Sequence, residues 1–192
     1  MKRFIFLSVV LLIAVQSVSC LAKPQAEGGG TTEYTPDDGF VFRGLSLNGE
    51  IGDLSVSDDV PLEMTFGFSP NPCEYNMSLI LETQFATDSP ETLDFSIEYQ
   101  ASTFGLGQMF QAWDWNTNFW IDFDGGYCGP FNAAIPFLNE GVYTFDLTQF
   151  IPGIVEEGTG RVRFRTVANR TGFLLNWPPT ISYDRIWWTT TE

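Results

Sequence analysis

Apolar and polar residues alternate along much of the chain, and this period of two restricts the possible folds more than any other feature. In the clearest example Leu93, Phe95, Ile97 and Tyr99 alternate with Thr, Asp, Ser and Glu. Successive side chains of a β-strand point to opposite faces of a sheet, so the pattern predicts a strand with one buried and one solvated face. No stretch of twelve residues carries the apolar spacing of a helix.

Short segments with this alternation are separated by clusters of Gly, Pro, Asn and Asp. Many short strands at such spacing predict an all-β domain, either an antiparallel β-sandwich or a barrel. The 18 phenylalanines suit a sandwich core, because sheets that pack about 10 Å apart need bulky side chains between them. The predicted strands cover residues 39–47, 60–68, 76–86, 91–101, 107–115, 118–123, 141–147, 160–168 and 180–190.

The N-terminal segment has the pattern of an export signal. Residues 1–20 begin with two basic residues, continue with a short apolar run and end in small residues suited to cleavage before Cys20. We therefore expect an exported protein, extracellular or at the cell surface. Cys20 is placed as in a lipobox, so it is a candidate for lipidation, and ordinary cleavage nearby is the alternative. Residues 21–39 have no apolar periodicity and predict a flexible linker before a β-sandwich domain at 40–192.

The remaining cysteines, Cys73 and Cys128, form the even number expected in an oxidising compartment. We predict a disulfide between them, and two unpaired buried thiols are the alternative. In the chain-entropy model such a bond would stabilise the fold by about 4 kcal/mol.

The chain contains no histidine, which excludes Ser-His-Asp and Cys-His catalysis and histidine-ligated zinc or copper. Carboxylates, tyrosines and arginines remain as possible catalytic groups, but no catalytic motif is found and no catalytic residue is predicted. The net charge of −15 argues against nucleic-acid binding, because phosphates would be repelled.

The six tryptophans all lie between Trp113 and Trp188, although the strand pattern extends back to Phe40. Trp113 and Trp115 share one strand face, and alternation places Trp187 with Tyr183 and Arg185 on a face opposite Trp188. Exposed indole rings beside polar groups suit sugar recognition, although aromatic rings more often fill sandwich cores. The candidate ligand-binding residues are Trp113, Trp115, Trp120, Trp187, Tyr183 and Arg163.

Three arginines, Arg161, Arg163 and Arg165, alternate on one predicted strand face. They could bind an anionic glycan, but neutralisation by carboxylates on adjacent strands is the interpretation we favour. Asp122 and Asp124 offer oxygen ligands of the kind that calcium takes, which makes Ca²⁺ the one cofactor candidate. Asn-Thr-Asn and Asp-Gly-Gly turns explain the same residues without a metal and are favoured.

Several short motifs support a family resemblance. The segment 107–120, with its closely spaced tryptophans, and the segments 160–165 and 184–188 resemble uncharacterised secreted β-sandwich domains of environmental, planctomycete-type bacteria. Residues 145–150 and 181–186 are similar to the late strands of jelly-roll carbohydrate-binding modules. The resemblance implies an antiparallel jelly-roll β-sandwich of the galactose-binding-like type in an exported protein, with no activity attached.

These observations favour a non-catalytic binding or adhesion module that recognises a polysaccharide or cell-surface glycan. A structural protein of the cell surface or matrix that assembles with its own copies is one alternative. A carboxylate-pair glycosidase or a polysaccharide lyase is another, and would need two carboxylates in a cleft. We expect no nucleic-acid partner, and membrane contact only through a lipid on Cys20.

Overall fold

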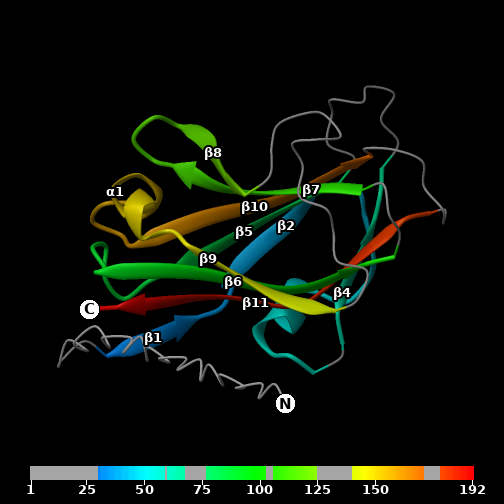
Figure 1. Cartoon of the computed structure of the whole chain (residues 1–192), viewed down its shortest axis with the longest axis horizontal. Coiled ribbons are helices and arrows are strands. Elements are labelled where there is room, and N and C mark those ends of the chain that lie inside the picture. Colours follow the sequence, from blue (N-terminus) through cyan, green and yellow to red (C-terminus); the bar gives the residue numbers. More distant parts are fainter. Residues whose placement is uncertain (1–29, 59, 68–76, 103–105, 125–139, 171–177) are drawn as a thin grey trace, which may run out of the picture.

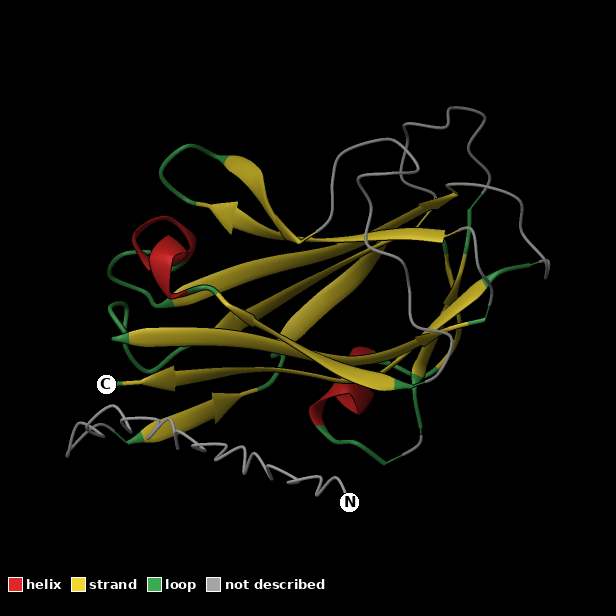
Figure 2. Ribbon diagram, in the orientation of Figure 1, coloured by secondary structure: helices red, strands yellow, loops and turns green. Residues whose placement is uncertain are grey.

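The structure is a computed structural model that describes residues 30–58, 60–67, 77–102, 106–124, 140–170 and 178–192. Within these residues β-strands dominate, and two antiparallel sheets pack face to face (Figures 1 and 2). No helix in this part of the chain is long and apolar enough to cross a membrane. Cys20, Cys73 and Cys128 lie outside the described residues, so the lipidation and disulfide assignments stay predictions.

The first sheet has six strands and the second has five. The first sheet has the order β3 (Leu45–Asn48), β4 (Leu62–Thr65), β11 (Thr180–Thr191), β6 (Thr92–Ala101) and β9 (Gly141–Asp146), with β1 (Thr31–Tyr34) paired to the end of β11. The second has the order β2 (Asp38–Arg43), β5 (Met77–Gln84), β10 (Arg161–Arg170), β7 (Leu106–Asp114) and β8 (Phe119–Asp124). Three short helical turns complete the described elements: η1 (Ile51–Ser55), η2 (Thr148–Phe150) and α1 (Ile151–Ile154).

The strand order is that of a jelly roll. From β4 to β11 the chain divides its strands between the sheets in the orders β4-β11-β6-β9 and β5-β10-β7-β8. Eight antiparallel strands connected in this way form the two Greek keys of a jelly roll. The prediction of an all-β, antiparallel jelly-roll sandwich is therefore confirmed.

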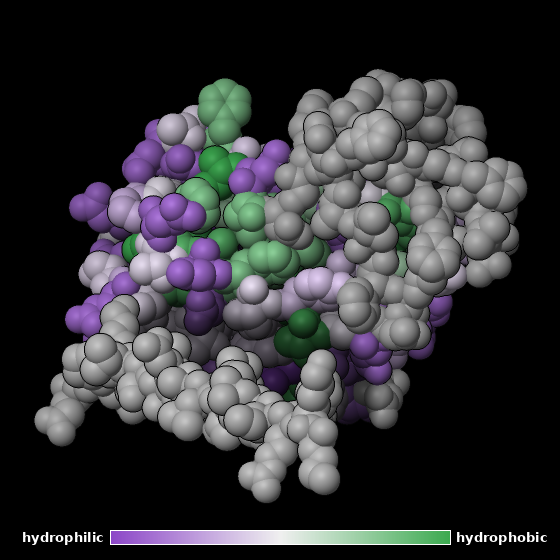
Figure 3. Space-filling view, viewed as in Figure 1, coloured by the Kyte–Doolittle hydropathy of each residue, from purple (hydrophilic) through white to green (hydrophobic). Residues whose placement is uncertain are grey.

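Aromatic side chains fill the space between the sheets. Phe95 of β6 stacks on Phe164 of β10 with ring centroids 4.0 Å apart, and it also contacts Trp188 of β11 at 5.6 Å. All three side chains are buried, which confirms the prediction that Trp188 faces the core. The core continues toward the edge strands β8 and β9, where apolar side chains reach the visible surface (Figure 3).

The predicted strand 39–47 is two strands that belong to different sheets. The chain leaves β2 and enters β3 at Gly44, whose φ is +93°. A Cβ atom at this position would lie 2.6 Å from the carbonyl oxygen of Thr65, so both the backbone angle and the space require glycine. The prediction of a single strand missed a change of phase at Gly44, where the apolar positions pass from Phe40 and Phe42 to Leu45 and Leu47.

The ordered sheet begins before Phe40. Residues 31–34 form β1, which lies beside the end of β11 (Figure 1). The Tyr34 ring packs against Phe85 with centroids 4.8 Å apart, and the Ala86 N–H donates to the Tyr34 hydroxyl. The prediction of a flexible linker throughout 21–39 is therefore wrong for residues 31–34. Their polar composition hid a strand that pairs with the threonine-rich end of β11.

Candidate functional site

The strand β10 places three arginines on the outer face of the five-stranded sheet. Val162 and Phe164 point inward and are buried, so Arg161, Arg163 and Arg165 point outward by alternation. The interpretation of this segment as a half-buried strand with a basic outer face is confirmed.

The neighbouring strands β7 and β8 place tryptophans beside these arginines. Trp113 and Trp120 are cross-strand partners whose ring centroids lie 5.3 Å apart in an edge-to-face arrangement. Trp115 follows β7, and its indole N–H donates to the carbonyl oxygen of Ile154 at 3.0 Å. This bond fixes the ring next to Trp113, with centroids 6.5 Å apart.

A tight turn between β7 and β8 brings Trp113 and Trp120 together. The Asp114 carboxylate accepts hydrogen bonds from the backbone N–H groups of Asn116 and Thr117, at 2.8 and 3.1 Å. Asn118 adopts a φ of +57°, a conformation that asparagine tolerates better than most residues. The favoured interpretation of the Asn-Thr-Asn sequence as a turn is confirmed.

The arginines stack over the tryptophan rings. The Arg161 guanidinium lies 4.5 Å from the centre of the Trp115 ring, and Arg165 lies 4.3 Å from that of Trp120. Arg163 lies between Trp115 and Trp113, at 5.1 and 5.8 Å. At these distances the negative face of each ring attracts the cation, so the two residue types hold each other in place.

Carboxylates and an amide neutralise and orient the same arginines. Glu82 of β5 forms ion pairs with Arg163, at 2.5 Å, and with Arg161, at 3.7 Å. Arg161 also bonds Glu156 through two nitrogens, at 3.0 and 3.1 Å. The expected neutralisation by carboxylates is therefore confirmed for Arg161 and Arg163. Arg165 donates to the Gln111 side-chain oxygen at 2.7 Å.

The Glu156 carboxylate is held in its charged form. Its pKa lies below the usual value, first because the Thr159 hydroxyl donates to it and then because Arg161 does. The same hydrogen bond raises the pKa of Arg161 above its ordinary value. This corner of the face is therefore a fixed ion pair at neutral pH.

A cavity of about 290 Å³ opens on this face. Its floor carries Arg163 and Arg165, and its two sides are aromatic, from β2 and from the β7–β8 hairpin. Phe40 and Phe42 on β2 are more than half exposed, at 54% and 55%. We call this surface the aromatic face, defined by the residues that line the cavity: Phe40, Phe42, Ile80, Glu82, Trp113, Trp120, Arg163 and Arg165.

Four of the predicted ligand residues, Trp113, Trp115, Trp120 and Arg163, are brought together here. Trp187 is not, because it lies on β11 in the other sheet, where the Arg185 guanidinium covers its ring at 4.6 Å.

Tyr183 is wrongly predicted as a surface ligand residue. It is fully buried between the sheets, and its hydroxyl bonds Gln108 at 3.0 Å and Thr166 at 2.9 Å. Burial raises the pKa of the Tyr183 phenol far above its usual value, and the two hydrogen bonds offset only part of that rise. The physical reason is a register shift between Tyr183 and Arg185, which changes the alternation that the sequence analysis assumed to be continuous.

The calcium candidate on β8 gains no further ligand from the described residues. The exposed Asp122 accepts a hydrogen bond from Gln111, and the Asp124 side chain lies outside the described part of the structure. A calcium ion held by Asp122 and Asp124 stays a prediction.

Sequence reasoning missed the contribution of Phe40 and Phe42. The two phenylalanines occupy alternate positions of a strand, which indicates a buried face. In the structure, however, Val41 between them packs against the core and the two phenylalanines point outward. Because apolar alternation normally marks the core side of a strand, no signal in the sequence distinguished the two faces.

The fold and this surface define the chain as a jelly-roll β-sandwich with an aromatic and arginine-rich outer face on one sheet. No protein-family model and no curated protein matches the sequence. Among solved structures, a CBM4 protein is 15% identical over 81% of this chain and 88% of its own, with a TM-score of 0.47.

Two further solved structures are similar at a distance. An infectious bursal disease virus structure is 10% identical over 95% of this chain and 36% of its own, with a TM-score of 0.47. A family 29 carbohydrate-binding module is 6% identical over 85% of this chain and 93% of its own, with a TM-score of 0.40. Values this low assign no function, so the functional argument depends on the chain's own residues. The similarity to planctomycete-type domains stays a prediction.

Proposed function

We propose that this chain is an exported carbohydrate-binding module without catalytic activity, and that the aromatic face is its binding site. The observation that supports this most strongly is the cavity in which hydrogen-bonding arginines lie between two aromatic sides. The export component depends on the signal pattern of residues 1–20.

The chemistry of this cavity matches that of a sugar chain. A pyranose ring has apolar C–H faces that pack on aromatic rings and hydroxyl edges that need hydrogen-bond partners. Phe42 and Trp120 supply rings on opposite sides, and Arg163 supplies donors between them. Because the arginines already stack on indole rings and bond neighbouring side chains, binding would order few additional groups.

The charges of this face favour a neutral polysaccharide over an acidic one. Glu82 and Glu156 already pair with Arg161 and Arg163, so an incoming carboxylate would have to compete with them. The net charge of −15 adds a repulsion that any polyanion must overcome at low salt. We therefore propose a neutral hexose or pentose polymer, or a neutral cell-surface glycan, as the ligand.

Affinity electrophoresis followed by titration calorimetry tests the proposal. The full chain is run in gels that contain neutral glucans, mannans, galactans or xylans, and in matched gels with alginate or pectate. We expect retardation by at least one neutral polymer and little by the acidic ones. In Trp120→Ala and Phe42→Ala, we expect affinity at least about tenfold lower, the usual effect of losing an aromatic anchor.

Trp187→Ala is the matched control, because Trp187 is also a half-buried tryptophan beneath an arginine but lies on the other sheet. It should bind like the unmodified chain. The proposal is wrong if no polymer binds, or if Trp187→Ala weakens binding as much as Trp120→Ala does.

A further inference from the structure

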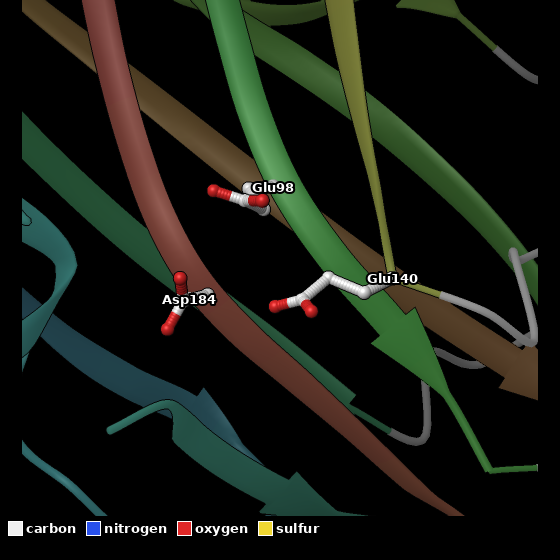
Figure 4. A group of neighbouring side chains, drawn as sticks. All are labelled: Glu98, Glu140 and Asp184. Carbon is white, nitrogen blue, oxygen red and sulfur yellow. The ribbon is translucent and has the colours of Figure 1, made fainter. Parts of the chain in front are cut away.

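Three carboxylates from three segments meet on the six-stranded sheet (Figure 4), whereas the aromatic face belongs to the five-stranded sheet. Glu98 lies on β6, Asp184 lies on β11, and Glu140 immediately precedes β9. One oxygen atom of each carboxylate lies within 4.8 Å of the corresponding atoms of the other two. Glu140 and Asp184 also line a cavity of about 200 Å³, together with Pro61, Gln100 and Ser182.

A β-bulge brings Asp184 into this group. Tyr183 is paired with Tyr99 and Arg185 is paired with Glu98, so Asp184 is an extra residue on β11 with no partner on β6. Bulges turn a side chain away from its expected direction and are frequent next to functional sites. Here Tyr183 points into the core, while the Asp184 carboxylate lies beside those of Glu98 and Glu140 (Figure 4).

The Asp184 carboxylate is buried and only half satisfied. The residue is 3% exposed, and one oxygen, Oδ2, accepts a hydrogen bond from the Ser57 hydroxyl at 2.8 Å. The other oxygen, Oδ1, is buried and has no hydrogen-bond partner among the described residues. Burying such an oxygen beside two further carboxylates is costly, because it has no described hydrogen-bond donor and lies among like charges.

The basic residue paired with Glu98 in the strand register forms no described ion pair with these three carboxylates. Arg185 lies opposite Glu98, but its guanidinium pairs with Glu33 and stacks over Trp187. A bound cation would satisfy the Asp184 oxygen and reduce the repulsion in the cluster at the same time.

We propose that Glu98, Glu140 and Asp184 bind a calcium ion. Three carboxylates and no nitrogen or sulfur ligand select a hard cation. Calcium binds oxygens at about 2.3–2.6 Å, so ligands on opposite sides of the ion are separated by about 4.6–5.2 Å, which accommodates the 4.8 Å limit of this cluster. Magnesium demands near-ideal octahedral geometry and gives up its waters reluctantly, so a cluster of three protein carboxylates suits calcium better.

The ion would link β6, β9 and β11, which backbone hydrogen bonds already pair. Through Asp184 it would also be connected to Ser57, in the N-terminal part of the domain. Its ligands come from β6, β11 and the start of β9, and the Ser57 hydroxyl beyond η1 bonds the same Asp184 carboxylate. We therefore assign the site a stabilising role. It is separate from the aromatic face and does not depend on the proposed sugar binding.

Calorimetric titration of the chelator-treated full chain with CaCl₂ tests the proposal, together with thermal unfolding with and without 5 mM CaCl₂. We expect one ion per chain with a Kd between about 10⁻⁵ and 10⁻³ M, the range from calcium sensors to extracellular modules, and a higher Tm with calcium. Glu98→Gln, which keeps the side-chain shape, should weaken binding at least tenfold. MgCl₂ should give a smaller rise in Tm at the same concentration.

The sign of the effect of Glu98→Gln on stability separates a metal site from a merely structural carboxylate. Without calcium the variant should unfold at a higher temperature than the unmodified chain, because one of three like charges is removed, and with calcium the order should reverse. Asp122→Asn is the matched control and should leave binding unchanged. The proposal is overturned if calcium gives no heat and no Tm rise, if magnesium acts equally, or if only Asp122→Asn abolishes binding.

Discussion

The change Tyr183→Phe removes one hydroxyl group from the centre of the sandwich without creating a cavity at the ring. The Tyr183 hydroxyl takes part in a closed set of three bonds, in which Gln108 donates to both Tyr183 and Thr166 while the two hydroxyls bond each other at 2.9 Å. The variant keeps only the Gln108–Thr166 bond, at 2.8 Å. Two buried hydrogen bonds at about 0.5–1.5 kcal/mol each predict a loss of about 2 kcal/mol in the free energy of unfolding.

Urea and thermal unfolding measure this loss, and a domain of this size should show a Tm lower by about 4–8 °C. Tyr34→Phe is the matched control. The Tyr34 hydroxyl accepts one exposed hydrogen bond from the Ala86 N–H, which water can replace, so we expect a loss below about 1 kcal/mol. Binding of any polysaccharide should be unchanged in Tyr183→Phe. The placement of Tyr183 in the core would be refuted by unchanged stability together with weaker sugar binding, which is the behaviour of a surface ligand residue.

Three further changes test other parts of the structure. Asp94→Asn should raise the free energy of unfolding at neutral pH by about 0.5 kcal/mol, because burial and then the cross-strand Asp146 raise the Asp94 pKa in the folded state. In pH-dependent unfolding curves this gain should vanish in acid, where protonation of Asp94 removes the same unfavourable charge. Gly44→Ala should cost more than about 1 kcal/mol in thermal unfolding, since its φ of +93° and a carbonyl oxygen 2.6 Å from the new Cβ both oppose a side chain, and unchanged stability would contradict the sheet crossing. Glu82→Gln should increase retardation by alginate or pectate at low salt but not at high salt, because it frees Arg163 from its carboxylate; equal retardation at both salt concentrations would argue against a role of charge.

The fold class could be predicted from the sequence because the alternation of apolar and polar residues within each strand is a local pattern. Leu93 to Tyr99 alternate without interruption, and the structure buries all four apolar side chains of that segment. The arginines of β10 follow the same rule, since Val162 and Phe164 on either side of Arg163 leave it only the outer face. Their pairing with carboxylates followed from the excess of acidic residues in the chain.

The parts that sequence reasoning missed depend on pairing between distant segments. The strand β1 is polar and forms because the end of β11 offers it an unpaired edge, which no local pattern encodes. Phe40 and Phe42 look like core residues, and only the pairing of β2 with β5 shows that they face outward. The candidate site therefore emerged from its tryptophans and arginines, while one of its aromatic sides could not be anticipated.

One extra residue on β11 accounts both for the wrong placement of Tyr183 and for the calcium site that we infer. Counting by twos from Trp188 puts Tyr183 on the outer face, and the count fails because Asp184 has no partner on β6. The same extra residue lets Tyr183 complete the buried hydrogen-bond network and turns the Asp184 carboxylate toward Glu98 and Glu140. Without the bulge, strict alternation from the inward-facing Trp188 would turn Tyr183 outward and Asp184 into the core, so neither the buried phenol nor the carboxylate cluster would form. The bulge leaves one buried oxygen of the Asp184 carboxylate without a described partner, which is unfavourable. A cation bound in the cluster would remove that cost.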